Sequence, residues 1–247
     1  MRIIGMIPAR LESSRLPQKA LIDIEGLPMV IHTCKRAQLS GKLNDVYLVT
    51  DNVAIKDAGE SYNIKCLMTG DHVSSTDRLA EACRDIDCDV IVNIQGDEPL
   101  VNPDHIDKVL EPIINDPMVT ITVGIAPFSK KNSYSDIKIV KDLNDNILYM
   151  SRNDIPSYYN NLKNIDMYKL CTIVPFKKEL LLDFSTWEET PLELAEDNHF
   201  LRILENGVKI RAVEIENAKI SVDTKDDLEE VRRLMKKDQI KLQYMSC

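Results

Sequence analysis

Three basic side chains follow the first apolar stretch of the chain. Residues 3–8 read IIGMIP, and Arg10, Arg15 and Lys19 come directly after them. Arginine binds phosphate through a planar fork of N–H donors, and lysine binds it as a compact charge. The spacing predicts a site for a negatively charged group, with a solvated basic loop as the alternative. The stretch contains neither GxxxxGK[ST] nor GxGxxG, so neither a P-loop nor a dinucleotide-binding turn accounts for it.

Two other segments supply carboxylates. The apolar stretch DVIVNI (89–94) leads into QGDEP (95–99), which contains Asp97, and SVDT (221–224) contains Asp223. Mg²⁺ is usually held by one or two carboxylates together with substrate phosphates. Asp97 and Asp223 fit that role if their loops converge, although Asp223 could instead cap the helix that follows it. Cations for a triphosphate and carboxylates for its magnesium together indicate nucleotidyl transfer.

The segment TGDHVSSTDR (69–78) combines hydroxyl groups with His72, Asp77 and Arg78. Such side chains, together with backbone groups, can hydrogen-bond a nucleobase and a ribose. Serine and aspartate are also common at the start of a helix, so a capped helix start is the alternative interpretation.

Strands and helices alternate in the first half of the chain. The apolar patterns predict strands at 2–7, 45–50, 64–68, 89–94 and 120–126, and helices at 29–39, 53–62, 75–86 and 103–115. This alternation predicts βαβ units and an α/β fold with a mostly parallel, Rossmann-like sheet. Ligands bind beyond the carboxyl ends of strands in such sheets, and there we place the loops 8–19, 69–78, 95–99 and 221–224.

The pattern changes after about residue 130. We expect an antiparallel hairpin over 137–152 around the turn LNDN, and one strand over KLCTIVPF (169–176). The remaining elements expected are a helix over 190–207 that ends at Gly207, a strand at 209–215, a helix at 224–237, and a disordered tail after 238. The chain therefore reads as a single domain over 1–247 with an inserted antiparallel and helical subdomain at about 130–215.

Composition limits the partners. The chain has 31 lysine and arginine residues against 40 aspartate and glutamate residues, a net charge of −9. Proteins that bind duplex nucleic acid usually present a basic face, so we expect no nucleic-acid partner. The longest apolar runs fall short of the roughly 18 residues that a membrane span needs, and the N-terminus does not resemble a signal peptide. We expect a cytoplasmic protein without a membrane partner.

The motifs IPARLESSRLPQKAL, TDRLAE, VNIQGDEPLV, PLELAE and VDT, with Ser-Arg at 151–152, occur in this order. In this order they resemble those of the CMP-Kdo synthetases, the 3-deoxy-manno-octulosonate cytidylyltransferases. The resemblance extends over about residues 1–236. It implies a nucleotidyltransferase fold and Mg²⁺-dependent transfer of CMP from CTP to a Kdo-like sugar acid, with release of pyrophosphate. It also implies a homodimer formed through the inserted region.

The resemblance assigns roles to individual residues. It implies catalytic roles for Arg10, Lys19, Asp97 and Asp223, with Asp97 and Asp223 as the Mg²⁺ ligands. The residues implied to bind the nucleotide are Pro8, Ala9, Arg10, Arg15, Lys19, Ser74, Thr76, Arg78 and Gln95. The residues implied to bind the acceptor are Gln95, Arg152, Glu196 and His199.

This chain departs from the family pattern mainly where the family contacts the sugar acid. Gln18 and Ser75 stand where the family has glycine, and these changes leave the charged residues in place. In the second half, Leu170, Val174, His199 and Phe200 replace a histidine, a tyrosine, a glutamate and a glutamine of the family. The nucleotide half of the site is therefore predicted to be retained and the acceptor half to be changed.

Three hypotheses remain at this point. The chain is a cytidylyltransferase that acts on Kdo, the same enzyme acting on a different acceptor, or a catalytically silent CTP-binding protein. His199 is either a contact to the acceptor or an ordinary histidine at an interface or surface.

Overall fold

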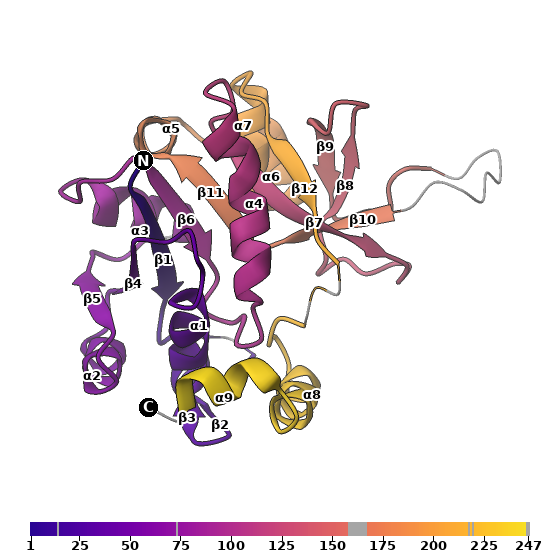
Figure 1. Ribbon diagram of the computed structural model, residues 1–247. Coiled ribbons are helices and arrows are strands. Elements are labelled where there is room, and N and C mark those ends of the chain that lie inside the picture. Colours follow the sequence, from indigo (N-terminus) through magenta and orange to yellow (C-terminus); the bar gives the residue numbers. More distant parts are fainter. Residues whose placement is uncertain (14, 73, 158–166, 217, 219, 246–247) are drawn as a thin grey trace.

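A five-stranded sheet forms the centre of the fold. The computed structural model describes residues 1–13, 15–72, 74–157, 167–216, 218 and 220–245. The strand order is β11-β6-β1-β4-β5, and β6 (Val90–Ile94), β1 (Ile3–Ala9), β4 (Asp45–Thr50) and β5 (Lys65–Met68) run parallel. The strand β11 (Ile173–Lys177) pairs antiparallel with β6. The predicted α/β fold with a mostly parallel sheet is confirmed (Figure 1).

Apolar residues cover both faces of this sheet. All seven residues of β1 are buried, and successive side chains of a strand point to opposite faces. Ile3 and Ile7 join a core cluster that includes Val30 of α1 (Met29–Ala37) and Val109 of α4 (Pro103–Asn115). On the other face, Ile4 and Met6 join a cluster that includes Leu79 of α3 (Ser75–Cys83). Helices on both faces explain why this strand reads as a continuous apolar run.

Two predicted helices of the first half begin at polar caps. The side chain of Asn52 accepts a hydrogen bond from Ala54 N at the start of α2 (Val53–Ser61), and that of Asn102 accepts one from Asp104 N at the start of α4. These side chains satisfy backbone N–H groups that the first helical turn leaves without an intrahelical partner. The helices therefore start where the sequence predicts them to start.

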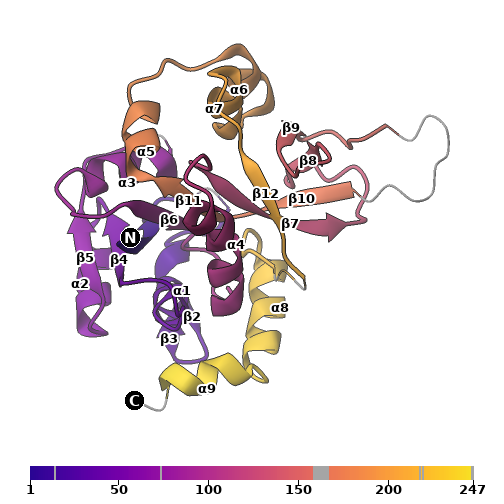
Figure 2. The same ribbon diagram turned by 45° about the horizontal axis from the view of Figure 1, so that its top comes forward.

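A second sheet lies beside the central one, to the right in Figures 1 and 2. Its order is β12-β7-β10-β8-β9, with β12 (Arg211–Glu214) parallel to β7 (Thr122–Phe128) and the other pairs antiparallel. The predicted hairpin is confirmed as β8 (Lys138–Lys141) paired with β9 (Ile147–Ser151). The expectation that 120–126 joins the parallel sheet is wrong, because β7 pairs within this second sheet.

The segment KLCTIVPF is two strands and not one. The strand β10 (Met167–Cys171) belongs to the second sheet and β11 to the central sheet, with Thr172 alone between them. Continuous apolar character conceals this change of sheet. Pro175 lies in β11, an edge strand of the central sheet, where a missing N–H group is tolerated.

Helices after residue 177 also differ from the prediction. The single helix expected over 190–207 is divided into α6 (Pro191–Glu196) and α7 (Phe200–Glu205), because Asp197 adopts a left-handed conformation with φ of 47°. The helix α5 (Lys178–Phe184) and the short strands β2 (Asp23–Ile24) and β3 (Leu27–Pro28) were not predicted.

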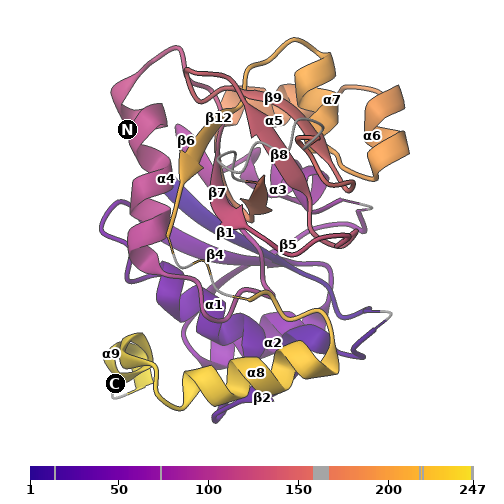
Figure 3. The same cartoon turned by 90° about the vertical axis from the view of Figure 1, so that its right-hand side faces the viewer.

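The C-terminal segment is helical. After α8 (Lys225–Met235), which confirms the prediction, the chain forms α9 (Gln239–Met245) in place of the expected disordered tail. Tyr244 is buried, and its hydroxyl group lies 2.7 Å from Nδ1 of His32 in α1. Asp238 forms an ion pair with the buried Arg36 of α1. These contacts hold α9 against α1, and α9 lies to the lower left of α1 in Figure 3. Within the described residues, every helix is too short or too polar to cross a membrane.

Candidate active site

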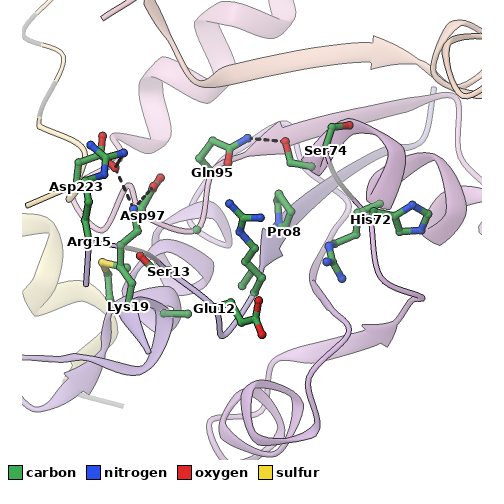
Figure 4. Close-up of a pocket in the computed structure, with 17 residues that line it drawn as sticks. Pro8, Glu12, Ser13, Arg15, Lys19, His72, Ser74, Gln95, Asp97 and Asp223 are labelled. Atoms are coloured by element: carbon green, nitrogen blue, oxygen red, sulfur yellow. Dashed lines mark hydrogen bonds and ion pairs between the residues drawn. The ribbon is translucent and has the colours of Figure 1, made fainter. Parts of the chain in front are cut away.

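A cavity of about 320 Å³ opens at the carboxyl ends of β1 and β6. Three loops and Asp223, which lies two residues before α8, form most of its wall, and Figure 4 shows Asp223, Asp97 and Lys19 at one end with His72 at the other. Its lining residues are Pro8, Ala9, Arg10, Glu12, Ser13, Arg15, Lys19, Ala20, Met29, His72, Ser74, Ser75, Arg78, Gln95, Gly96, Asp97 and Asp223. The loops expected at this edge of the sheet therefore meet around one cavity.

Lys19 joins the two aspartates. Its Nζ atom lies 2.6 Å from Oδ2 of Asp97 and 3.2 Å from Oδ1 of Asp223. Nη2 of Arg15 lies 3.4 Å from the same Asp223 oxygen. The backbone N–H of Val222 donates to the carbonyl oxygen of Asp97 at 3.0 Å, so the two loops are also joined through the main chain. The predicted convergence of the Asp97 and Asp223 loops occurs.

The two aspartates fit a magnesium ion in number and type. Their oxygens already meet around one positive group, the ammonium of Lys19. Within the described ranges, no group of three or more His, Cys, Asp or Glu side chains is arranged to hold a metal. A pair of carboxylates is enough protein for Mg²⁺, because this ion takes its remaining ligands from phosphates and water.

Backbone conformation places Lys19 in the cavity. Gln18, where the family has glycine, adopts a left-handed conformation with φ of 54° and precedes the short 3-10 helix η1 (Lys19–Leu21). This turn brings the Lys19 side chain back toward the end of β1. Gly96 is needed for a different reason: a Cβ atom there would lie 2.8 Å from the carbonyl oxygen of Pro8. The loop after β6 can therefore lie directly against the end of β1.

Glu98 connects three segments behind the aspartates. Its Oε1 atom accepts hydrogen bonds from Ser221 Oγ at 2.6 Å and from Thr172 Oγ1 at 2.7 Å. Burial, reinforced by the charge of Asp97, raises the pKa of Glu98 to about 7. Glu98 thus joins the Asp97 loop to the Asp223 loop and to the junction between the two sheets.

Arg78 lines the cavity, and neighbouring residues hold its side chain in place. Its side chain is nearly fully buried; Nη2 donates to Oδ2 of Asp51 at 2.7 Å, and Nη1 donates to Oγ1 of Thr69 at 2.9 Å. Asp51 follows the end of β4, and Thr69 follows the end of β5. The guanidinium group lines the cavity in an orientation that the two neighbouring strands fix.

The loop before α3 is tied back onto that helix. The backbone N–H of Gly70 donates to Glu81 at 3.1 Å, and the His72 ring also contacts the Glu81 carboxylate. Both hydrogen bonds lower the pKa of Glu81, with that of His72 contributing most. Ser74 caps α3 by accepting from Asp77 N at 3.1 Å. Ser74 therefore both caps the helix and lines the cavity.

Thr76 lies outside this cavity. It is fully buried, and its Oγ1 atom is 2.9 Å from Nε2 of His199. The His199 ring packs against Phe200 and, edge to face, against Phe184, and burial lowers its pKa to about 4. His199 is therefore a neutral link between the second half of the chain and α3, and its contact with an acceptor stays a prediction.

The residues implied to bind the acceptor separate into two places. Gln95 lines the cavity, where its amide donates to Ser75 Oγ at 3.2 Å and to Asn93 Oδ1 at 3.3 Å. Arg152 and Glu196 lie in the second half of the chain and bind each other: the Arg152 backbone N–H donates to Glu196 Oε2 at 2.7 Å. The Arg152 guanidinium also donates to backbone oxygens of Tyr134, Glu196 and Asp197.

Three of the residues that depart from the family pattern, Leu170, Val174 and Phe200, are apolar and lie in apolar surroundings. Val174 and Phe200 are buried in the core cluster that lies against α3, and Leu170 packs against the same cluster. The sequence analysis assigned no ligand role to six cavity residues: Glu12, Ser13, Ala20, Met29, Ser75 and Gly96. Glu12 could have been predicted, because it lies within the predicted basic loop. Met29 could not, because an apolar residue at the start of a helix does not indicate a ligand site.

Known proteins resemble this chain over nearly its whole length. The cytidylyltransferase family model matches residues 4–210. The 3-deoxy-manno-octulosonate cytidylyltransferase of Geobacter metallireducens is 37% identical over 97% of this chain and 100% of its own length. That of Chlorobium limicola is also 37% identical, over 96% of this chain and 98% of its own length.

A solved structure agrees closely with the whole fold. The structure of CMP:2-keto-3-deoxy-manno-octonic acid synthetase complexed with CTP superposes with a TM-score of 0.93 and is 33% identical. The superposition covers 96% of this chain and 99% of the chain in the solved structure. Family model, relatives and fold agree over nearly the full length. The chain therefore belongs to the cytidylyltransferase family and is a nucleotidyltransferase enzyme of the CMP-Kdo synthetase type.

Proposed function

We propose that this enzyme transfers CMP from CTP to a Kdo-like sugar acid and releases pyrophosphate. The observation that carries the proposal is the meeting of Lys19 with Asp97 and Asp223 in the cavity that Arg10 and Arg15 also line. This arrangement combines cations for a triphosphate with two carboxylates for its metal. The solved structure complexed with CTP, at 33% identity, supports the same nucleotide.

In the proposed reaction, a hydroxyl oxygen of the acceptor attacks the α-phosphorus of CTP. The new P–O bond forms in line with the bond between the α-phosphorus and pyrophosphate. The electron pair of that broken bond leaves with pyrophosphate, and the proton of the attacking hydroxyl group passes to water. Arg10, Arg15 and Lys19 neutralise the charge that grows on the leaving group. Positioning and charge stabilisation of this kind dominate phosphoryl transfer.

We propose Mg²⁺ as the cofactor, with Asp97 and Asp223 as its protein ligands. A bound Mg²⁺ supplies polarisation of phosphate oxygens and a lower pKa for a nearby hydroxyl group. The contribution of the chain is to hold the two carboxylates together through Glu98, Ser221 and the hydrogen bond from Val222 to Asp97.

A second candidate is the same CTP chemistry on a different acceptor. The apolar surroundings of Leu170, Val174 and Phe200, together with the internal hydrogen bonds of Arg152, favour a changed acceptor site. A polar group that is missing from such a site can change selectivity strongly, since an acceptor group is then left without a hydrogen-bond partner. The names of the relatives favour Kdo itself.

Pyrophosphate release with CTP and Mg²⁺ distinguishes these candidates. The panel of acceptors is Kdo, its 8-amino analogue, sialic-type acids and a blank. Turnover on Kdo supports the proposed function, and turnover on another acid alone supports the second candidate. Binding of CTP without release of pyrophosphate in the presence of any acceptor would indicate the catalytically silent protein.

We also propose that the segment 130–215 forms an acceptor and dimerisation subdomain, and that the enzyme is a homodimer. Large apolar side chains are exposed there at the β8–β9 turn (Leu143), on β9 (Leu148) and on α6 (Leu194). Exposed apolar residues that gather in one region commonly mark protein interfaces. Analytical ultracentrifugation tests this proposal: a dimer is expected for the wild type, and a monomer at all concentrations would contradict it.

A further inference from the structure

The ammonium group of Lys19 lies where Asp97 and Asp223 meet. It contacts one carboxylate oxygen of each residue, at 2.6 Å and 3.2 Å. The Lys19 side chain is 17% exposed, compared with 26% for Asp97 and 39% for Asp223, so the cation is the most enclosed of the three. The protein itself therefore neutralises part of the charge of the two carboxylates.

A divalent cation on these carboxylates conflicts with Lys19 in this position. Mg²⁺ binds oxygen ligands at about 2.0–2.1 Å, and Mn²⁺ prefers the same type of ligand. A dication on the two oxygens that Lys19 contacts would lie within a few ångströms of the ammonium group. Repulsion between like charges is strong in a partly buried site. Lys19 must move away when the metal binds.

A triphosphate provides a new partner for Lys19. Lys19 begins η1 and lines the cavity together with Arg10 and Arg15. Phosphate oxygens form strong charge-assisted hydrogen bonds with an ammonium group. A nucleotide in the cavity can therefore attract Lys19 and free both carboxylates in the same event.

We propose that Lys19 holds the metal site closed to free divalent cations until the nucleotide arrives. In the free enzyme its ammonium group replaces the metal between Asp97 and Asp223. When CTP binds, Lys19 turns to the phosphates and the carboxylates receive the metal, so metal binding depends on nucleotide binding. This inference rests on the proposed function, because it requires Asp97 and Asp223 to be the metal ligands.

Arg15 is placed for a weaker version of the same role. Its Nη2 atom lies 3.4 Å from Asp223 alone, and its side chain is 59% exposed. Solvent screens such an exposed pair. Removal of Arg15 is therefore expected to open the metal site much less than removal of Lys19.

Binding of Mn²⁺ to the enzyme without nucleotide tests the inference. The enhancement of water-proton relaxation detects protein-bound Mn²⁺ and distinguishes it from Mn²⁺ bound to CTP in solution. Lys19→Met keeps an unbranched side chain that is one atom shorter and removes its charge. We expect it to bind Mn²⁺ about tenfold or more tightly than the wild type, since one unit of nearby positive charge is lost. Lys19→Arg keeps the charge and should bind Mn²⁺ as weakly as the wild type.

Two control variants restrict the effect to this site. Lys65→Met removes a lysine whose Nζ atom lies 2.5 Å from Asp45 on the surface, and it should leave Mn²⁺ affinity unchanged. Lys19→Met combined with Asp97→Asn should lose the gain. Circular dichroism verifies that each variant is folded, and Lys19→Gln replaces Lys19→Met if the latter is not.

Three outcomes decide between the inference and the proposed function. A gain of Mn²⁺ affinity in Lys19→Met that disappears with Asp97→Asn supports the inference. Wild-type binding of Mn²⁺ in the presence of CTP, with no gain in Lys19→Met or Lys19→Gln without CTP, overturns the inference and leaves the proposed metal site standing. Failure of the wild type to bind Mn²⁺ even with CTP overturns the metal site itself.

Discussion

Lys19 and Asp97 are 78 positions apart in the sequence, and their side chains meet at 2.6 Å. The first belongs to the loop after β1 and the second to the loop after β6, which are neighbouring parallel strands. Parallel pairing brings the carboxyl ends of such strands to one edge of the sheet, which is where α/β proteins bind ligands. The contact between these two residues is thus a direct consequence of the order of strands in the sheet.

Substitution of Asp97 should affect the chemical step most. We expect Asp97→Asn to lower kcat by about 100-fold, or about 2.7 kcal/mol, the scale of losing a principal electrostatic stabiliser. Steady-state pyrophosphate release measures it. Asp87→Asn is the matched control, because the Asp87 side chain is exposed on the surface, where it pairs with Arg2. Near-normal turnover of Asp97→Asn would remove Asp97 from the metal site.

Substitution of Asp51 should affect CTP binding more than the chemical step. Asp51 orients Arg78 through a bond of 2.7 Å and does not itself line the cavity. A hydrogen bond to a charged group contributes about 1.5–3 kcal/mol, so Asp51→Asn should raise the KM for CTP by about tenfold. Kinetics at saturating acceptor concentration measure this change. An equal increase in the KM for the acceptor would contradict a role confined to the nucleotide.

The basic loop and the QGDEP segment could be predicted from sequence because each signal is local. An apolar run followed by charged residues marks the end of a buried strand, and parallel topology then requires Arg10, Lys19 and Asp97 to share one edge. The capped start of α3 was likewise a local signal, and Ser74 does accept a hydrogen bond from Asp77 N there. The meeting of Arg10, Lys19 and Asp97 at one cavity depends on such features and could therefore be predicted.

The structure of the second half of the chain depends on contacts that no local sequence pattern specifies. A single residue, Thr172, separates two strands in different sheets, and the apolar run on either side of it is continuous. The left-handed conformation of Asp197 breaks a helix that its periodicity favours. The tail is helical because Tyr244 reaches His32, a contact between the two ends of the chain. Tertiary packing decides all three.

The stability of the protein should depend on pH through Glu98. Its pKa is raised to about 7, so the folded state holds a proton that the unfolded chain releases near pH 4.5. The stabilisation is complete below the unfolded pKa and is lost as pH rises through the folded pKa. From about pH 5.5 to about pH 8, the wild type should lose about 2 kcal/mol relative to Glu98→Gln.

Urea denaturation of both proteins at the two pH values measures this difference. Glu98→Gln has no titrating group at this position and keeps an oxygen that can accept from Ser221 and Thr172. Parallel stability curves for the two proteins would show that the Glu98 carboxyl does not titrate in this range.

The hydrogen bond between Thr76 and His199 should couple the two halves of the enzyme. Because burial lowers the pKa of His199 to about 4, the ring is neutral near pH 7 and bonds Thr76 as a neutral partner. A double-mutant cycle with Thr76→Val and His199→Phe should give a coupling energy of about 1 kcal/mol in the free energy of unfolding. Strict additivity of the two substitutions would mean that the contact contributes no coupling.

A crystal structure of the enzyme with CTP and Mg²⁺ tests most directly whether the cavity is the nucleotide site. We predict that the triphosphate lies against Arg10, Arg15 and Lys19, with Lys19 withdrawn from Asp97 and Asp223 and the metal between these two carboxylates. A triphosphate bound outside this cavity, or a metal held by other residues, would contradict the proposed function.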